Sequence, residues 1–238
     1  MDISAFPLFE AISAAATVAT AGIAYKALRN WQSQERAKRQ AEFLDQFLDA
    51  THAFVIEINK PIGSLRSAKM GMASHVETWA DEDEEEKILN GAIAYIQKRA
   101  ERTAGRMREA LSALDPILIQ MSSLLAKGQV FQFSHYVEAE RSIHGLMHQA
   151  NRLNSFLAVI DSPSWNWGHP EIRELLRKIM AIDPDEIKLS VGQHNSAMIA
   201  FVRDRYEDIY GKPRSRPKRS GWWPLRWRRG TARTKELG

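Results

Sequence analysis

The amino-acid sequence predicts an all-α protein in which an amino-terminal transmembrane helix continues into a cytosolic helical bundle, followed by a disordered basic tail. An uncharged run from residue 11 to 25 directly precedes a cluster of basic residues. Apolar residues then recur at helical spacing through the body, where no stretch alternates with the period of two that a half-buried strand needs. The last 28 residues are rich in Pro, Gly and Arg, a composition that cannot bury a core of its own.

The charge is divided unevenly along the chain. The whole sequence of 238 residues has a formal net charge of +4. Residues 211–238 hold ten Lys and Arg against one Glu, about +9, which leaves about −5 for residues 1–210. The chain has no cysteine, which excludes disulfides, thiolate nucleophiles and cysteine-ligated zinc.

The amino-terminal apolar run is the feature that organises the prediction. A spanning helix needs about 20 apolar residues, so 15 uncharged ones are a short span. We expect a stub at residues 1–10, outside the membrane, and a transmembrane helix at 11–29. A secretory signal peptide fits less well because Asp2 and Glu10 precede the run and no basic residue does. A buried helix of a soluble protein is the third interpretation that a run this short allows.

Basic residues on the carboxyl side of the run give its expected orientation. Cytoplasmic flanks carry an excess of Lys and Arg, which places the body in the cytoplasm and the amino terminus outside. The residues concerned are Lys26, Arg29, Arg36, Lys38 and Arg39.

Small residues recur in the run at intervals of four. Ala11, Ala15 and Ala19 share one helix face, with Gly22 nearby. In lipid this spacing lets helix backbones approach closely, which predicts a homo-oligomer packed through the anchor. An Ala-rich segment can also show the spacing by chance.

The body at residues 30–210 is expected to be a helical bundle. Residues 30–59 continue the anchor as one helix, which Pro61 and Gly63 are expected to end. Further on, Asp-Pro pairs that cap a helix and place Pro in its first turn occur twice. The remaining expected helices are 62–80, 88–114, 116–128, 134–160, 170–181 and 184–210.

An unbroken acidic run occupies residues 81–86. Acidic residues are favourable at a helix start, so the expected structure is a solvated loop followed by the first turn of a helix. Docking of a basic surface, including this chain's own tail, is the alternative.

The carboxyl-terminal tail at 211–238 combines tryptophan with arginine. Tryptophan favours the headgroup layer and arginine is attracted to anionic lipids, so we expect the tail to bind the membrane surface. A plain solubilising tail and binding of nucleic acid by stacking and phosphate contacts are the alternatives. The residues concerned are Arg219, Trp222, Trp223, Arg226, Trp227, Arg228 and Arg229.

Motifs that would indicate catalysis are scarce. The sequence has no P-loop, dinucleotide-binding glycine motif, nucleophile elbow or HExxH. His144 and His148 lie one turn apart, but two histidines of one helix need further ligands, so we expect no metal and no cofactor.

Arg141 followed by His148 resembles the Arg-x4–6-His signature of HEPN ribonucleases, which are helical bundles. In that family, Arg and His of two protomers meet at a dimer interface and cleave RNA. The family usually has a polar residue, commonly Asn, after the arginine, and here it is Ser142. The resemblance implies a membrane-tethered ribonuclease as the alternative to a non-enzymatic protein.

The order of features over residues 8–60 resembles a loose group of bacterial single-pass proteins. The features are an acidic stub, an Ala/Thr anchor containing ISAAATVA, and the basic-aromatic AYKALRNW before a helical body. Some members are encoded among phage-defence and abortive-infection genes. The resemblance implies an inner-membrane protein without catalytic residues, acting as an oligomerising effector or scaffold.

Overall fold

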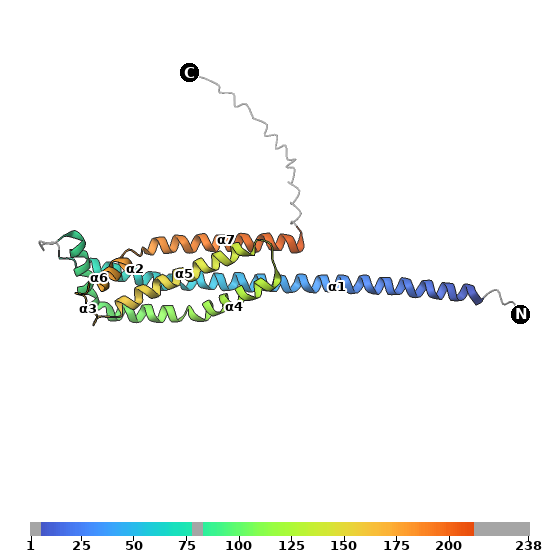
Figure 1. The fold of residues 1–238 in the computed structure, drawn as a ribbon, viewed down its shortest axis with the longest axis horizontal. Coiled ribbons are helices and arrows are strands. Elements are labelled where there is room, and N and C mark those ends of the chain that lie inside the picture. The colour runs from blue at the N-terminus through green and yellow to red at the C-terminus, as the bar shows by residue number, and fades with distance from the viewer. Residues whose placement is uncertain (1–5, 78–82, 212–238) are drawn as a thin grey trace, which may run out of the picture.

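A computed structural model describes residues 6–77 and 83–211, with side chains from Ser13 onward. Its described part is all-α, as the sequence predicts, and an elongated bundle carries one helix that projects far beyond it (Figure 1). The helices are α1 (Phe6–Glu57), α2 (Asn59–Ala73), α3 (Glu84–Ser112), α4 (Asp115–Phe131), α5 (Tyr136–Ile160), α6 (Pro170–Met180) and α7 (Pro184–Tyr210).

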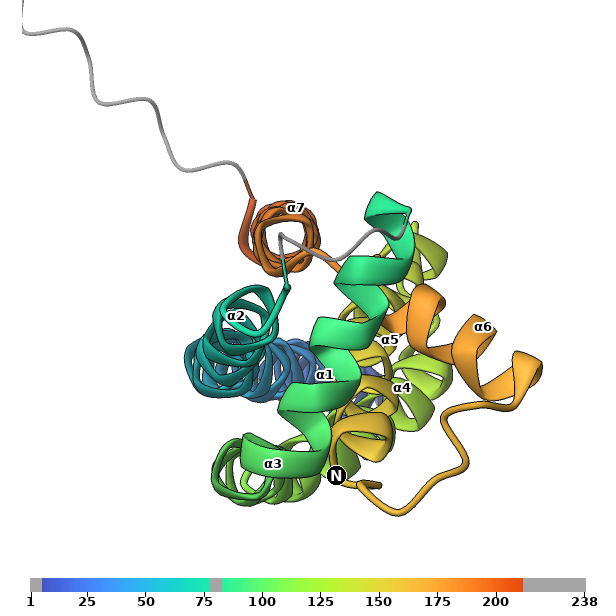
Figure 2. The ribbon, with the colours of Figure 1, turned by 90° about the vertical axis from the view of Figure 1, so that its left-hand side faces the viewer.

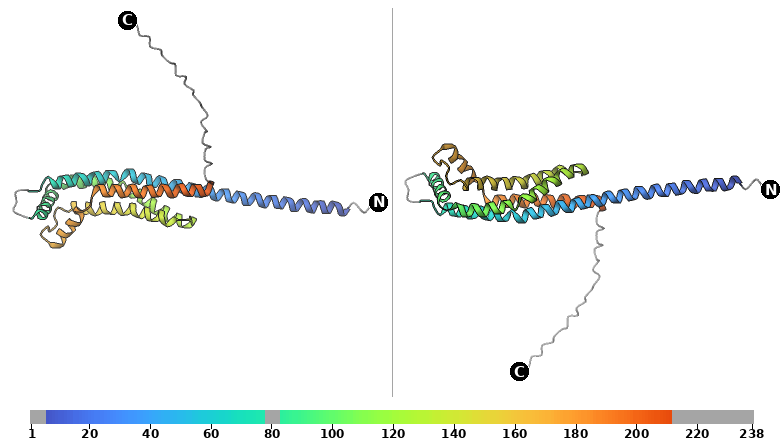
Figure 3. Two further views of the ribbon diagram at one scale, coloured as in Figure 1. Left: turned by 90° about the horizontal axis from the view of Figure 1, so that it is seen from above. Right: turned by 90° about the horizontal axis from the view of Figure 1, so that it is seen from below.

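Helix α1 has two parts with different surroundings. Residues 13–34 are exposed on all sides, whereas the packed part begins at Ala41 and not at residue 30. Phe47 and Phe54 of the packed part are completely buried against the bundle. The projecting part runs away from the bundle along its long axis, as the two views of Figure 3 show.

The prediction that Pro61 and Gly63 end the first helix is wrong. The break lies at Ile58, and α2 begins at Asn59 and continues in nearly the same direction. A proline inside a helix removes the bond to the carbonyl four residues back and crowds it, here that of Glu57. Ile58 keeps helical angles, and the Ile62 N–H still donates to the Ile58 carbonyl at 3.2 Å. The helix is therefore interrupted at Ile58, but the chain keeps its direction.

Side-chain contacts hold α7 against α2. Lys69 donates from Nζ to the Ile182 carbonyl at 2.8 Å, and Arg66 pairs with Asp185 in the first turn of α7. Burial lowers the pKa of Lys69, although Asp183 opposes the shift. Asp183 also caps α7 by accepting from the Asp185 N–H at 2.9 Å, as the Asp-Pro pattern predicts.

The prediction that Gly128 ends its helix is also wrong, because α4 continues to Phe131. A Cβ on Gly128 would lie 2.2 Å from Tyr136 Oη, so glycine serves close packing there. Tyr136 donates to the Leu125 carbonyl at 2.7 Å. Burial, with Glu140 nearby, raises the pKa of Tyr136 to about 12.

The acidic run docks onto a basic surface of the bundle itself. Glu85 and Glu86, in the first turn of α3, pair with Arg177 and Arg173 of α6. Helix α6 lies beside α3 at the end of the bundle far from the N terminus (Figure 2). The last two residues of the run therefore pair with arginines of this chain, whereas Asp83 and Glu84 are exposed; residues 81 and 82 lie outside the described ranges.

None of the helices in the described ranges combines the length and the apolarity needed to cross a membrane. Half of the predicted stub, residues 1–5, lies outside the described ranges, as do residues 212–238 of the tail; the other half, residues 6–10, belongs to α1.

Candidate functional site

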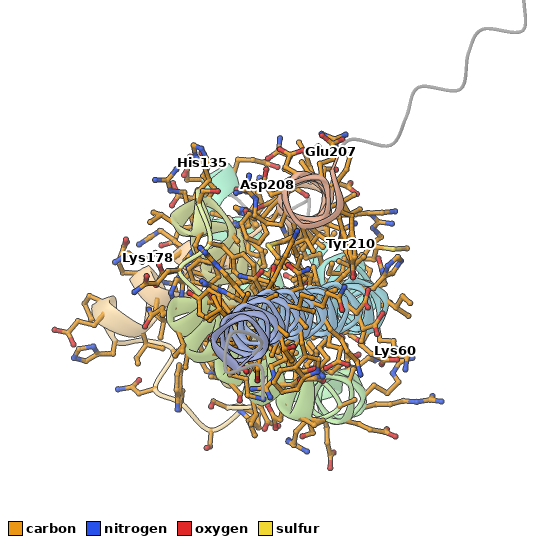
Figure 4. The ribbon with its side chains drawn as sticks, turned by 90° about the vertical axis from the view of Figure 1, so that its right-hand side faces the viewer. Lys60, His135, Lys178, Glu207, Asp208 and Tyr210 are labelled. Carbon is orange, nitrogen blue, oxygen red and sulfur yellow. The ribbon has the colours of Figure 1, made fainter. Side chains whose placement is uncertain are left out.

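Three separate segments meet at the end of the bundle nearest the N terminus. We call this region the proximal end and define it by residues 31–45 of α1, residues 128–136 from the last turn of α4 to the start of α5, and residues 201–210 of α7. Figure 4 views it along α1 and shows His135, Asp208 and Tyr210 around it. Tyr206 fixes α7 to α1, because its hydroxyl donates to Asp45 Oδ1 at 2.6 Å and lies 3.3 Å from the Ala41 carbonyl oxygen.

The projecting helix leaves the proximal end with apolar side chains in full exposure. Val18 and Ile23 are 72% and 71% exposed. Thr17 and Thr20 donate to the carbonyls of Ser13 and Ala16, so these hydroxyls are satisfied within their own helix. A helix whose hydroxyls bond inward presents few unsatisfied donors to an apolar environment.

The predicted helix-packing residues lie in this part of α1. Ala15, Ala19 and Gly22 are exposed, and nothing lies within 4 Å of a Cβ placed on Gly22. Ala11 belongs to the same helix, although its side chain lies outside the described part. No described residue of this chain covers their shared face, so packing against it would have to come from another molecule.

The basic cluster after the apolar run is partly neutralised. Arg39 Nε donates to Glu35 Oε1 at 3.0 Å, and Lys38 Nζ lies 3.8 Å from Glu42 Oε1. Both pairs are exposed, so their attraction is weak and screened by salt. Arg36 has neither a hydrogen bond nor an ion pair with any described residue.

A cavity of about 400 Å³ lies where α1 leaves the bundle beside the last turn of α4. We call it the α1–α4 corner. It combines exposed tryptophan, a rigid phenylalanine and two arginines, and its residues are Trp31, Gln32, Glu35, Arg36, Arg39, Val130 and Phe131.

A second cavity, of about 430 Å³, lies between α5 and α7. Arg205 lines it, is only 9% exposed, and stacks over the Phe201 ring at 5.8 Å from the centroid. Its Nη1 pairs with Asp208 at 2.8 Å, so the buried guanidinium keeps a counter-ion. Glu138 and Asp204 also line the cavity; the His135 ring lies 3.7 Å from Glu138, and Arg203 pairs with Asp204 at 3.2 Å.

The residues of the predicted ribonuclease motif are both exposed on α5. No described side chain pairs with Arg141 or His148, and Ser142 between them faces inward and donates to the Glu138 carbonyl at 3.0 Å. His144 lies 3.9 Å from Glu140. Within the described ranges, no three His, Asp or Glu side chains are grouped so that they could hold a metal.

The predicted membrane-binding residues of the tail, from Arg219 to Arg229, lie outside the described ranges. The structure does show where this segment starts. Helix α7 ends at Tyr210 in the proximal end, with Gly211 at a φ of 79°. The tail therefore starts at the same end of the bundle from which α1 projects.

Comparison of the chain with protein-family models, with curated proteins and with solved structures finds no match in any of the three.

Sequence reasoning included Trp31, Arg36 and Arg39 but missed Val130 and Phe131. These two residues are about a hundred positions away from the others in the sequence. The available signal was an apolar pair that begins two residues after Gly128, just past the expected end of a helix, because a solvent-facing helix terminus seldom needs one.

Proposed function

We propose that the chain is a single-pass protein of the bacterial inner membrane, with its bundle in the cytoplasm, that acts without catalysis as a self-associating effector or scaffold. One observation carries the proposal. Helix α1 continues, unbroken and uncovered, for more than 25 residues beyond the core, and most of that extension is uncharged.

An uncovered helix of this kind needs an apolar partner. Isolated helices gain little in water, and most helical stability in proteins comes from packing. Residues 11–29 extend for about 28 Å at about 1.5 Å per residue, close to the roughly 30 Å of a hydrocarbon core. Lys26 and Arg29 would lie near the inner surface, where their long side chains reach the headgroups.

The composition of the projecting segment also favours association of several copies. Ala, Thr and Ser give the segment modest insertion energy compared with a leucine-rich helix. The face formed by Ala11, Ala15, Ala19 and Gly22 would let a second copy approach closely, which adds van der Waals contact in lipid. Hence we propose a homo-oligomer packed through α1.

The start of the tail supports membrane binding by residues 212–238. Tyr206 lies level with Ala41, and Ala41 is about 22 Å along the helix from Lys26. Ten extended residues reach at most about 35 Å, so Trp222 could return to the membrane surface. The tether keeps its local concentration high, and weak contacts with anionic headgroups suffice.

A role in phage defence follows only from the resemblance of residues 8–60 to bacterial single-pass proteins. The exposed apolar surface of α1 is compatible with an effector that assembles in the membrane. Nucleic-acid binding by the tail is the competing proposal, and competition between RNA and anionic vesicles for the full-length protein would separate the two.

The test is extraction of the full-length protein, followed by its mass in mild detergent after correction for bound detergent. We expect a membrane fraction that resists salt and alkaline carbonate, and a discrete oligomer. The variant Ala15→Leu with Ala19→Leu should change the mass of the oligomer. The control, Ala16→Leu with Ala24→Leu, adds the same two leucines on other faces. Protein that remains soluble without detergent would contradict the proposed membrane anchor, and a monomeric mass would contradict the proposed self-association.

A further inference from the structure

We infer that the α1–α4 corner binds the headgroup of an anionic phospholipid. The inference deepens the proposed function and rests on it, because the corner meets the lipids of a bilayer only if α1 is inserted. It concerns the described bundle and not the tail.

The corner is built from two elements that hold one another in place. On its α4 side, Phe131 packs on Phe43 at 5.1 Å and on Phe133 at 5.5 Å between ring centroids. Gln132 adopts a φ of 51° and turns the chain immediately afterwards. This packing holds in place the end of α4, where Val130 lines the corner together with Trp31 of α1.

Two of its apolar side chains have no cover in the described part of the chain. Trp31 is 61% exposed and Val130 is 80% exposed, although Phe131, the next residue after Val130, packs against the core. Exposed apolar side chains that gather in a concavity mark a binding surface more often than scattered ones do. An acyl chain or glycerol backbone would cover both.

The polar side of the corner is suited to a single negative charge. Arg36 is without an ion pair among the described residues, and Arg39 uses only its Nε toward Glu35. Arginine binds phosphate oxygens through paired N–H groups in a planar fork. Two guanidinium groups and one carboxylate leave a net charge of about +1, which complements the −1 of a phosphodiester.

The depth of the corner agrees with a lipid ligand. Trp31 lies about 3 Å along the helix beyond Arg29, at the level that interfacial tryptophan favours. Arg36 lies about 10 Å beyond Arg29, while the polar layer is roughly 5–8 Å thick on each side. Its flexible side chain reaches back into that layer. A soluble phosphate would use the arginines but would leave Trp31 and Val130 uncovered.

The experiment is native mass spectrometry of the full-length protein in detergent with equal amounts of phosphatidylglycerol and phosphatidylcholine. Wild type should retain phosphatidylglycerol preferentially. Arg36→Gln and Arg39→Gln should each lower that preference about fivefold, the effect of one basic residue at a membrane surface. Val130→Ser should lower the retention of both lipids.

Two matched controls separate a site from general attraction. Lys38→Gln removes the same charge from the same helix but lies outside the corner, and Ile119→Ser removes an exposed apolar residue of α4 that also lies outside it. Both should change retention less than twofold. If Lys38→Gln equals Arg36→Gln, diffuse charge explains the binding and the inference fails. Competition by inorganic phosphate at the same concentration would also overturn it.

The experiments distinguish a wrong proposal for the membrane anchor from a wrong proposal for the phospholipid site at the α1–α4 corner. Wild-type protein that is soluble without detergent disproves the anchor. The same variants are then titrated with short-chain phosphatidylglycerol below its micelle concentration. A wild-type preference lost in Arg36→Gln would keep the corner as a phospholipid site, and equal binding by all variants would end the inference.

Discussion

Tyr206 of α7 donates a hydrogen bond to Asp45 of α1 at 2.6 Å, and this contact connects the last helix to the base of the projecting one. It joins residues 161 positions apart. The contact holds the start of the tail beside the projecting helix.

Replacing Tyr206 with Phe should cost about 1 kcal/mol of unfolding free energy, because one hydrogen bond to a charged acceptor is lost. Burial and the Asp45 carboxylate raise the pKa of Tyr206 in the folded protein. As the pH rises, the unfolded chain therefore loses the phenolic proton before the folded protein does. The stability that the neutral Tyr206 hydroxyl contributes is present below pH about 10 and is lost as the pH rises above it.

Urea unfolding at pH 7.5 and 10.5 measures both effects. The control is Tyr210→Phe, which changes the neighbouring stacked ring, 65% exposed. A Tyr206→Phe protein with the same alkaline loss of stability as wild type would show that another group titrates there.

Substituting alanine for Gly128 should destabilise the protein by about 2 kcal/mol. The new Cβ would lie 2.3 Å from Tyr136 Cζ, and Tyr136 is buried and hydrogen-bonded, so the ring cannot move away without loss. Overpacking of this kind costs about 1–3 kcal/mol. In Gly105→Ala the Cβ meets nothing within 4 Å, so that substitution should stabilise by up to about 1 kcal/mol.

Thermal and chemical unfolding of both glycine variants gives the comparison. The double variant Gly128→Ala, Tyr136→Leu should cost less than the sum of its two single substitutions, because the smaller side chain makes room. Equal changes in stability for Gly128→Ala and Gly105→Ala would mean that helix propensity alone determines the effect, without a contribution from the contact with Tyr136.

Much of the fold could be predicted from the sequence because local signals agree there. The Asp-Pro pairs at 115–116 and 183–184 and the apolar stripes predict α3 to α7 with bounds within a few residues. Asp183 caps α7 as expected, but the prediction that Asp115 caps its helix is wrong, because Asp115 lies inside α4 and the N-cap position is Leu114. The errors occur where one residue type serves two purposes. Pro61 stands so near the start of α2 that only one backbone bond is lost, and Gly128 admits a side chain eight residues ahead.

The candidate site could be predicted only in its α1 half. The spacing of the apolar run and its basic flank is local, so Trp31 and Arg36 could be placed from the sequence. Val130 reaches the corner through aromatic packing of Phe131 on Phe43, which no local pattern encodes. The same holds for Glu86 and Arg173, which are 87 positions apart.

His194 should make the free energy of unfolding decrease at mildly acidic pH. Its ring occupies the space that a Cβ on Gly145 would need, at 2.2 Å from Nε2. Burial lowers its pKa below 6.5 in the folded protein. The unfolded chain binds the proton first, so the stability that His194 contributes when neutral is lost as the pH falls below about 6.5.

Unfolding of wild type and His194→Gln at pH 7.5, 6.5 and 5.5 tests this. The variant should lose less stability on acidification than wild type does. The control is His148→Gln, which removes an exposed histidine of α5. Parallel slopes for all three proteins would assign the acid sensitivity to carboxylates.

The contacts between α3 and α6 should control local opening more than global stability. Glu85 is 64% exposed and Glu86 is 42% exposed in their pairs with Arg177 and Arg173. Exposed ion pairs contribute about 0–1 kcal/mol each and weaken with salt. Because α6 is short and has only Leu176 and Ile179 buried, loss of these pairs should free it first.

Hydrogen exchange of Glu85→Gln with Glu86→Gln should therefore show faster exchange in α6 amides, with global stability reduced by less than about 2 kcal/mol. High salt should produce the same pattern in wild type. Glu84→Gln removes a charge from the same helix start and so controls for the macrodipole. If Glu84→Gln speeds exchange in α6 equally, charge at the start of α3 matters and the pairing does not.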